Sequence, residues 1–300
     1  MQGVTMENFQ SLELGHKEIF NRFFKQDPPR VSELTFTNLF IWQHKYAPTW
    51  AVAGDCLLII CRPKDQAAFG LQPVGPGDKA KALQLLVESL KQMSSESRIE
   101  RVDEAFVKAY VEPESYTVEL DRDNSDYVYL AQDLIQLSGN KFHRKKNHVN
   151  QFIKKYRFEY RTLNRDLLKS FLNLQENWCQ LRECVAYPDL WSEDYAVHTA
   201  LTHFGDLDFQ GGAILIDDKV EAFALGESLN EDTAVIHIEK ANPEINGLYA
   251  AINQVFCREA WSDMRYINRE QDMGIEGLRQ AKESYYPDHR VQKYSVKPKF

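Results

Sequence analysis

The segment YINREQDMGIEGLRQAKESYYP, from Tyr266 to Pro287, begins as a short strand pattern, passes through a polar turn and ends as a helix pattern. The turn holds a run of polar and charged residues, namely Asn268, Arg269, Glu270, Gln271 and Asp272. Open α/β sheets bind their ligands at the carboxyl ends of strands. We therefore expect a ligand site at this turn.

A second strand-to-helix junction precedes the first. Residues 233–241, TAVIHIEKA, alternate as a strand does, and Asn242-Pro243 then interrupts the pattern. A helical pattern opens at Asn246-Gly247 and continues to residue 261. Two adjacent junctions of this kind predict neighbouring strand ends that share one pocket.

The same order of elements occurs in both halves of the chain, as hairpin, helix, strand and helix. In the first half we expect strands at 49–53 and 56–62, a helix at 78–93 capped by Asp78, a strand at 99–102 and a helix ending at 110. In the second half we expect strands at 212–216, 220–229, 233–241 and 265–268, and helices at 248–261 and 275–284. Between them we expect a strand at 126–130 and helices at 134–156, 165–181 and 192–204, the last capped by Ser192. This repetition predicts two similar α/β domains.

Composition indicates a globular chain. Of its 300 residues 43% are hydrophobic, which is enough for one large or two ordinary cores. The longest apolar run, CLLIIC at 56–61, is far shorter than the ~20 residues that cross a bilayer. We expect no transmembrane segment and a cytoplasmic location. The five cysteines form no CxxC pair, so we expect reduced packing residues and no metal site.

Charge is unevenly distributed. The net charge is −8, yet residues 141–165 contain nine Lys and Arg against one acid, Glu159. Six of these cations lie on the predicted helix, and five of the six are candidates for contact with nucleic-acid phosphates: Arg144, Lys145, Lys146, Lys154 and Lys155. A basic island in an acidic chain could steer tRNA, although such helices also occur simply as solvated faces.

Three segments resemble the C-terminal domain of the phosphatidylglycerol lysyltransferase family. They are EKANPEINGLYAAINQ at 239–254, GNKFHRKKNHVNQFIKKY at 139–156 and the opening segment at 266–287. The resemblance implies a mixed α/β fold of two tandem acetyltransferase-like domains, similar to the Fem-type transferases. It divides the chain into an N-terminal domain at 1–138, a basic connecting helix at 139–164 and a C-terminal domain with the active site at 165–300.

The resemblance also implies an activity, namely transfer of an aminoacyl group from aminoacyl-tRNA to an amine or hydroxyl of a small-molecule, peptide or lipid-headgroup acceptor. The lipid acceptor is open because the chain carries no predicted membrane span. In the general acetyltransferase pattern an Asn on the fifth strand and a Tyr on the next helix are functional. Asn268 and Tyr285 occupy those places here.

Acyl transfer needs a base, donors for the oxyanion and an acid for the leaving oxygen. Glu239 is the candidate base, with Glu227 and Glu270 as competitors, because it follows His237 on one strand face. Candidate donors are Asn268 and Arg269, and candidates for protonating the leaving group or binding a ribose are Lys282, Tyr285 and Tyr286. Substrate contacts are expected from Asn246, Gly247, Gln271, Asp272 and Lys282.

Two other functions stay open on the same fold. An acyl-coenzyme A dependent N-acyltransferase would need a phosphate-binding turn at 241–247, but ANPEING has one glycine, a proline and an acid, so we expect no cofactor. A noncatalytic binding protein would use Arg269, Glu270 and Lys282 only as a structural ion-pair network.

Overall fold

The structure is a computed structural model that describes residues 8–64, 66–93 and 96–299. Its contacts divide the chain into two compact units. Unit 1 comprises residues 1–126, 271–274 and 290–300, and unit 2 comprises residues 127–270 and 275–289. Because both units are discontinuous in sequence, the division into domains at 1–138, 139–164 and 165–300 stays a prediction.

Unit 1 contains a mixed sheet whose strands follow the order β1-β2-β3-β4-β5-β12-β6. Only the β4–β5 pair is parallel among the pairings recorded for its described residues. The strands are β1 (Gln10–Ser11), β2 (Thr49–Ala53), β3 (Cys56–Cys61), β4 (Phe69–Gly70), β5 (Ile99–Asp103), β12 (His289–Pro298) and the first part of β6 (Tyr116–Leu130).

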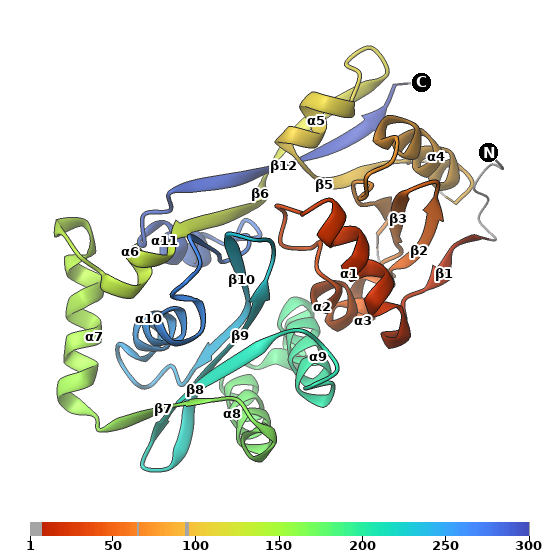
Figure 1. The fold of residues 1–300 in the computed structure, drawn as a ribbon. Helices are drawn as coiled ribbons and strands as arrows, with labels where there is room; N and C mark the ends of the chain where they lie inside the picture. Colours follow the sequence, from red (N-terminus) through yellow and green to blue (C-terminus); the bar gives the residue numbers. More distant parts are fainter. Residues whose placement is uncertain (1–7, 65, 94–95, 300) are drawn as a thin grey trace. The chain divides into compact units, whose positions relative to one another are not determined.

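The helices of unit 1 lie beside its sheet (Figure 1). They are α1 (Lys17–Gln26), α2 (Phe36–Ile41), α3 (Gln43–Tyr46), α4 (Lys79–Lys91) and α5 (Glu104–Tyr110), with a 3-10 turn η2 at Leu14–His16. Leu83, Leu86 and Leu90 of α4 meet Leu58 and Ile60 of β3 in one core. The 3.6-residue spacing of these leucines explains why α4 buries one face.

Unit 2 contains a second mixed set of strands in the order β6-β11-β10-β9-β8-β7. The β10–β11 pair is parallel and the other recorded pairs are antiparallel. The strands are β7 (Phe158–Thr162), β8 (Gln210–Ile216), β9 (Lys219–Ser228), β10 (Thr233–Ala241), β11 (Tyr266–Asn268) and the last part of β6.

Helices cover both faces of the unit 2 sheet (Figure 1). Ala222 and Ala224 of β9 join the core formed with α10 (Leu248–Trp261), whereas Phe223 between them stacks on Phe171 of α8 (Leu168–Leu181). Successive side chains of β9 point to opposite faces of the sheet, so α10 and α8 pack on opposite faces. The remaining helices are α6 (Ala131–Gln136), α7 (His143–Lys155), α9 (Pro188–Thr202) and α11 (Glu276–Glu283), with 3-10 turns η3 (Asn140–Phe142), η4 (Arg165–Leu167) and η5 (Cys184–Ala186).

Most sequence-based elements are confirmed, including both hairpins, the bounds of β10 and α10, and the Asp78 cap, which accepts a hydrogen bond from the Lys81 amide. The predicted helix at 134–156 is wrong as one element, because Leu137 and Gly139 adopt positive φ angles and separate α6 from α7. Superposition of the two halves stays a prediction.

The Ser192 cap is wrong. The helix begins earlier, with Pro188 in its first turn, and the Ser192 hydroxyl donates to the Pro188 carbonyl inside α9. Proline suits the first helical position because its missing N–H has no partner to lose there.

Two of the five cysteines are not reduced. Cys179 and Cys184 form a disulfide, with Cα atoms 5.0 Å apart across a turn in which Glu183 is left-handed. Cys56, Cys61 and Cys257 are buried free thiols, as expected. In the part of the chain that the structure describes, no helix is long and apolar enough to cross a membrane.

Candidate functional site

The two strand ends predicted to meet do lie together in unit 2. β10 and β11 run parallel, and their pairing ends at Val235 and Asn268. β10 continues beyond that point to Ala241 alongside β9. Glu239 therefore lies past the end of β11, where the chain turns away from β10 and the side chain of Arg269 can reach it.

Glu239 accepts hydrogen bonds from two neighbours. Arg269 Nη2 lies 3.0 Å from Glu239 Oε1, and Asn253 Nδ2 of α10 lies 2.9 Å from Oε2. Only about an eighth of each charged side chain is exposed, 13% for Glu239 and 14% for Arg269. Burial alone would lower the pKa of Arg269, but Glu239 and two tyrosines raise it, so the guanidinium stays charged.

Two polar atoms of this cluster have no hydrogen-bond partner among the described residues. They are Arg269 Nη1 and Asn253 Oδ1, both buried. Leaving a buried donor or acceptor without a partner lowers the stability of the folded state by about 1–3 kcal/mol. One donor and one acceptor are thus available beside the Glu239 carboxylate.

Aromatic rings and a lysine hold Arg269 in place. Its guanidinium carbon lies 4.8 Å from the ring centre of Tyr285 and 5.7 Å from that of Tyr129. Lys282 Nζ donates to the Arg269 carbonyl, and Tyr129 Oη donates to the Lys282 carbonyl at 2.9 Å. Lys282 therefore fixes the backbone at Arg269. Burial raises the pKa of the Tyr285 hydroxyl above its usual range.

Lys145 of α7 belongs to the same cluster. Its Nζ lies 4.1 Å from the ring centre of Tyr285. Burial, and then the positive charges of Arg269 and Arg144, lower the pKa of Lys145 to about 8. Among the described residues no carboxylate lies within salt-bridge distance of its ammonium group, although Glu239 is close enough to oppose the shift.

His237 forms a second cluster with Glu227 and Glu270, in which His237 and Glu227 are buried and the Glu270 side chain is 17% exposed. Its two ring nitrogens lie 2.8 Å from Glu270 Oε1 and 2.8 Å from Glu227 Oε1. Burial opposes protonation, but the hydrogen bonds to both carboxylates raise the pKa of His237 to about 10. A β-bulge between Ile236 and Ile238 turns this residue toward both partners.

Asn268 and Glu270 shape the turn after β11. Asn268 Oδ1 accepts a hydrogen bond from the Glu270 amide at 2.8 Å, and Glu270 adopts a left-handed φ of 56°. Asn268 is fully buried, and Glu270 is directed to His237. Both residues therefore hold the backbone on either side of Arg269.

The other predicted substrate contacts are dispersed. Gln271 and Asp272 belong to unit 1, where Asp272 pairs with Arg122 at 2.9 Å and accepts from the Gly274 amide. Asn246 is exposed. Gly247 packs so closely on α7 that a Cβ there would lie 2.4 Å from the His148 carbonyl oxygen. The substrate-binding role of these residues stays a prediction.

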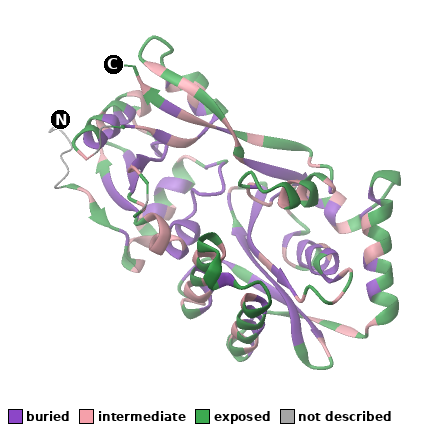
Figure 2. Cartoon of the chain, turned by 180° about the vertical axis from the view of Figure 1, so that it is seen from behind, coloured by how far each residue is buried: buried purple, intermediate pink, exposed green. Residues whose placement is uncertain are grey.

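The cations predicted to bind tRNA differ in exposure. Arg144, Lys146, Lys154 and Lys155 are exposed along α7, whose surface is open over most of its length (Figure 2). Lys145 alone is half-buried, against Tyr285.

Sequence reasoning missed Asn253 as a contact of Glu239. It lies within the apolar pattern of α10, and a buried Asn in such a helix is the signal that could have identified it. His237 served in the sequence only to place Glu239 on a strand face, and the structure shows its two carboxylate partners. Lys145 was grouped with the exposed cations, because nothing local distinguishes it from Lys146.

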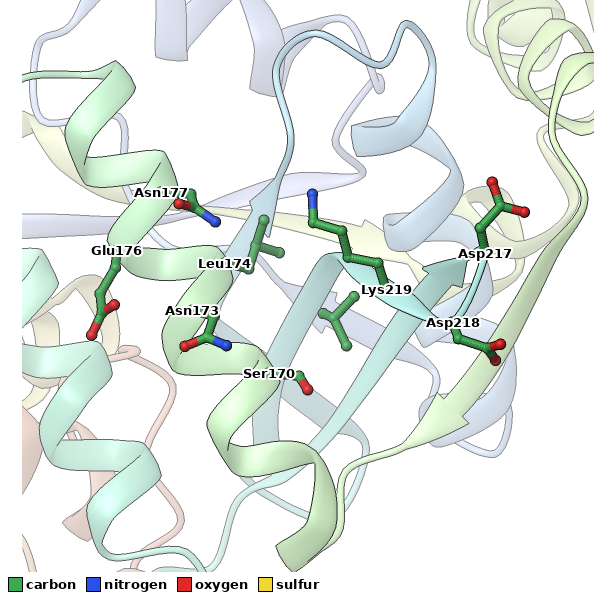
Figure 3. Close-up of a pocket in the computed structure, with 9 residues that line it drawn as sticks. Ser170, Asn173, Leu174, Glu176, Asn177, Asp217, Asp218 and Lys219 are labelled. Atoms are coloured by element: carbon green, nitrogen blue, oxygen red, sulfur yellow. The ribbon is translucent and has the colours of Figure 1, made fainter.

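A polar pocket of about 370 Å³ occurs elsewhere in unit 2. Side chains of α8 line it on one side and the β8–β9 turn, Asp217 to Lys219, on the other (Figure 3). None of the predicted site residues lines it. Within the described ranges, no group of three His, Cys, Asp or Glu side chains could hold a metal ion.

Solved structures similar to this chain include a protein of unknown function, a C-terminal synthetase domain and FemX. A protein of unknown function from Bacteroides thetaiotaomicron is 34% identical and covers 97% of this chain and 99% of its own, with a TM-score of 0.90. A C-terminal domain from Agrobacterium fabrum, described as that of a "Putative Lysylphosphatidylglycerol Synthetase", is 11% identical. It covers 95% of this chain and 92% of its own, with a TM-score of 0.70. FemX is 8% identical, covers 96% of each chain and has a TM-score of 0.59. The mixed α/β fold is therefore similar to that of Fem-type transferases.

Sequence comparison identifies the family. An uncharacterised protein from Mycoplasmoides gallisepticum is 26% identical over 186 residues, which are 61% of this chain and 59% of that protein. The match thus spans less than two thirds of that relative. The sequence pattern described as "Phosphatidylglycerol lysyltransferase, C-terminal" matches residues 24–297, nearly the whole chain. This chain belongs to the phosphatidylglycerol lysyltransferase C-terminal family.

Proposed function

We propose that this protein transfers an aminoacyl group from aminoacyl-tRNA to an amine or hydroxyl acceptor. The family and the Fem-type fold support a transferase role. The observation that carries the proposal is the buried Glu239–Arg269–Asn253 cluster, which keeps one donor and one acceptor without a partner among the described residues.

In the proposed reaction the acceptor nitrogen or oxygen attacks the ester carbonyl of the donor. Glu239 takes the proton of the nucleophile, and the Arg269 guanidinium donates to the oxygen that becomes negative. The bond between the carbonyl carbon and the ribose oxygen then breaks, and that oxygen takes a proton from Lys145 or Tyr285. Lys145 suits this role because its pKa of about 8 lets it give up a proton near neutral pH.

Other predicted residues hold Arg269 in position in this scheme and do not touch the substrate. Lys282 binds the Arg269 carbonyl, and Asn268 and Glu270 fix the turn that carries Arg269. Displacement of a reacting group by about 1 Å can reduce a rate about a hundredfold, so these contacts matter even without touching substrate.

The proposal requires no cofactor. Coenzyme A dependent transferases bind pyrophosphate at a helix amino terminus that is open to the ligand. Here the turn before α10 packs on α7, and the His148 carbonyl oxygen approaches Gly247. A carbonyl oxygen repels phosphate, which supports the aminoacyl-tRNA donor over an acyl-coenzyme A donor.

Two further parts belong to the proposal. The chain is built from two tandem acetyltransferase-like domains with the reaction in the second, and it acts in the cytoplasm, where charged tRNA is available. The acceptor is a small molecule, a peptide or a lipid headgroup.

A panel of charged tRNAs and acyl-coenzyme A donors tests the proposal. The purified protein is incubated with each donor and with hydroxylamine as a general acceptor, and loss of the acyl group is measured. We expect accelerated deacylation of at least one aminoacyl-tRNA and of no acyl-coenzyme A. Release from coenzyme A alone would favour the N-acyltransferase, and no release from any donor would favour a noncatalytic binding protein.

A further inference from the structure

Tyr249 lies in the first turn of α10, one helical turn before Asn253. Residues four positions apart lie on the same face of a helix, so Tyr249 shares the face from which Asn253 donates to the Glu239 carboxylate. Tyr249 is 38% exposed, whereas the Glu239 side chain is only 13% exposed. Tyr249 is therefore the more accessible neighbour of this carboxylate.

The phenol oxygen of Tyr249 is held from two sides. Trp178 Nε1 of α8 donates to it at 2.9 Å, and the Ala241 amide at the end of β10 also interacts with it. Trp178 is itself fixed, because Lys240 Nζ lies 3.6 Å from its ring centre and pairs with Glu193 of α9 at 2.7 Å. Contacts with three elements, α8, α9 and β10, thus set the position of one hydroxyl group.

These contacts leave the hydroxyl proton of Tyr249 available. Trp178 and the Ala241 amide are both donors to the oxygen, so neither can accept the proton. Within the described ranges, Tyr249 has no recorded acceptor for it. Burial and the charges of Glu239 and Glu193 raise the pKa of the phenol despite the two donors, so the proton stays on it at neutral pH. Tyr249 therefore offers a hydrogen-bond donor beside Glu239.

We propose that Tyr249 is a substrate-binding residue whose hydroxyl donates to an uncharged carbonyl oxygen of the ligand. The phenol lies in the field of two carboxylates, Glu239 and Glu193, and this field disfavours a carboxylate or phosphate oxygen at the same place. An uncharged carbonyl oxygen has two lone pairs, so it can also accept from the unpartnered Arg269 Nη1. Resting on the proposed function, this oxygen is that of the aminoacyl ester, and Tyr249 selects uncharged acyl groups at the Glu239 site.

A fluorine label tests the site without any need for turnover. Tyr249 is replaced by meta-fluorotyrosine, whose fluorine resonance responds to hydrogen bonding of the adjacent hydroxyl. The probes are acetamide and acetate, which have nearly the same shape but differ in charge, and the amide N–H of acetamide suits the unpartnered Asn253 Oδ1. The control carries the same label at Tyr160 of β7, a partly buried tyrosine that β8 and β9 separate from β10.

We expect acetamide to shift the resonance at position 249 in a saturable way, and acetate at the same concentration to shift it at least fivefold less. Neither probe should shift the resonance at position 160 by more than a fifth of that amount. No saturable shift at position 249 would overturn the site. An acetate shift as large as that of acetamide would overturn the uncharged oxygen, and equal acetamide shifts at both positions would mean that the contact is nonspecific and overturn the site as well.

A variant pair connects the site to the reaction. Tyr249→Phe removes only the hydroxyl, and it should lower kcat/KM for aminoacyl transfer about fivefold, since a neutral hydrogen bond contributes about 1 kcal/mol. Tyr160→Phe should change kcat/KM less than twofold, and equal values for the two variants would contradict the role of Tyr249. An acetamide shift at position 249 without transfer from any donor would reject the proposed function and keep the site, whereas transfer without that shift would reject the site alone.

Discussion

Lys293 in unit 1 and Lys145 in unit 2 are both withdrawn from water, but their surroundings differ. Lys293 is fully buried, and its Nζ lies 2.6 Å from Glu33 Oε2 and 2.6 Å from Asp126 Oδ1. Burial would lower its pKa, but Asp126 and Glu33 raise it. Lys145 has cations and an aromatic ring around it, and its pKa falls to about 8. The comparison separates a lysine that stabilises the fold from one that is kept available for a ligand.

The groups around each lysine support this difference. In unit 1, Arg101 lies 3.4 Å from Glu33 and donates to the Tyr46 hydroxyl at 2.9 Å, so charges alternate through the cluster. In unit 2, Arg269 Nη1 and Asn253 Oδ1 lack hydrogen-bond partners among the described residues. Glu33 Oε1 in unit 1 also lacks a hydrogen-bond partner there, but it keeps its ion pair with Arg101. A buried network with paired charges serves the fold, whereas incomplete pairing suits a site that binds something else.

The largest expected effect tests the structural side of the comparison. Lys293→Met removes the ammonium that pairs with the buried carboxylates of Glu33 and Asp126, so the free energy of unfolding should fall by about 3–5 kcal/mol. The urea midpoint of unfolding, followed by circular dichroism, measures this. Lys297→Met is the matched control, because Lys297 pairs with Glu119 on the surface, and it should change stability by less than about 1 kcal/mol. Equal midpoints for the two variants would contradict the role of Lys293.

The next effect tests the catalytic side. Glu239→Gln keeps the shape of the side chain and removes the proposed base, so aminoacyl transfer should slow at least about a hundredfold. Affinity for aminoacyl-tRNA should not fall, since Glu239 is proposed to act on the nucleophile and its loss removes a negative charge beside Arg269. Single-turnover deacylation and a separate binding titration measure the two quantities. A Glu239→Gln protein that transfers at the normal rate would remove Glu239 from the mechanism.

Much of this fold was predictable from local patterns. β10 and α10 have the predicted bounds because alternation and helical periodicity there are uninterrupted. β12 was not predicted. Its residues find their partners on β5, nearly 200 positions earlier in the chain, and no local pattern reveals such a partner. Whether a segment of mixed exposure such as β12 forms a strand depends on its pairing with distant segments and not on its own residue pattern.

The site was predictable in outline but not in detail. The polar turn after β11 and the end of β10 indicated that Glu239 and Arg269 would meet, and they do at 3.0 Å. Asn253 was hidden within an apolar helix, and Lys145 looked the same as its neighbours. What distinguishes Lys145 is contact with Tyr285, some 140 residues away, which only the folded chain reveals.

A third prediction concerns His237. Like Lys293 it contacts two carboxylates, but it lies beside the proposed site. Its pKa is raised from 6.5 to about 10, so its charge stabilises the fold fully below about pH 6.5, and this contribution is lost as the pH rises to 10. His237→Gln should lower the free energy of unfolding by about 2–3 kcal/mol at pH 6 and by much less at pH 10. Urea midpoints of both proteins at pH 6, 8 and 10 measure the difference. A difference that is constant with pH would mean that His237 is neutral between its two carboxylates.

The smallest expected effect is a change of slope, and it tests whether the exposed cations of α7 contact the phosphates of tRNA. Arg144→Ala, Lys146→Ala, Lys154→Ala and Lys155→Ala each remove one exposed charge. If each cation neutralises one phosphate, every substitution should reduce the slope of log K against log salt by about 0.7–0.9. Binding should therefore weaken more at low salt than at high salt. Affinities for an aminoacyl-tRNA at four salt concentrations give the slopes, with Lys169→Ala, which alters an exposed lysine of α8, as the control. If the variant that combines all four substitutions keeps the slope of the unaltered protein, the exposed face of α7 is a solvated face that contacts no phosphate.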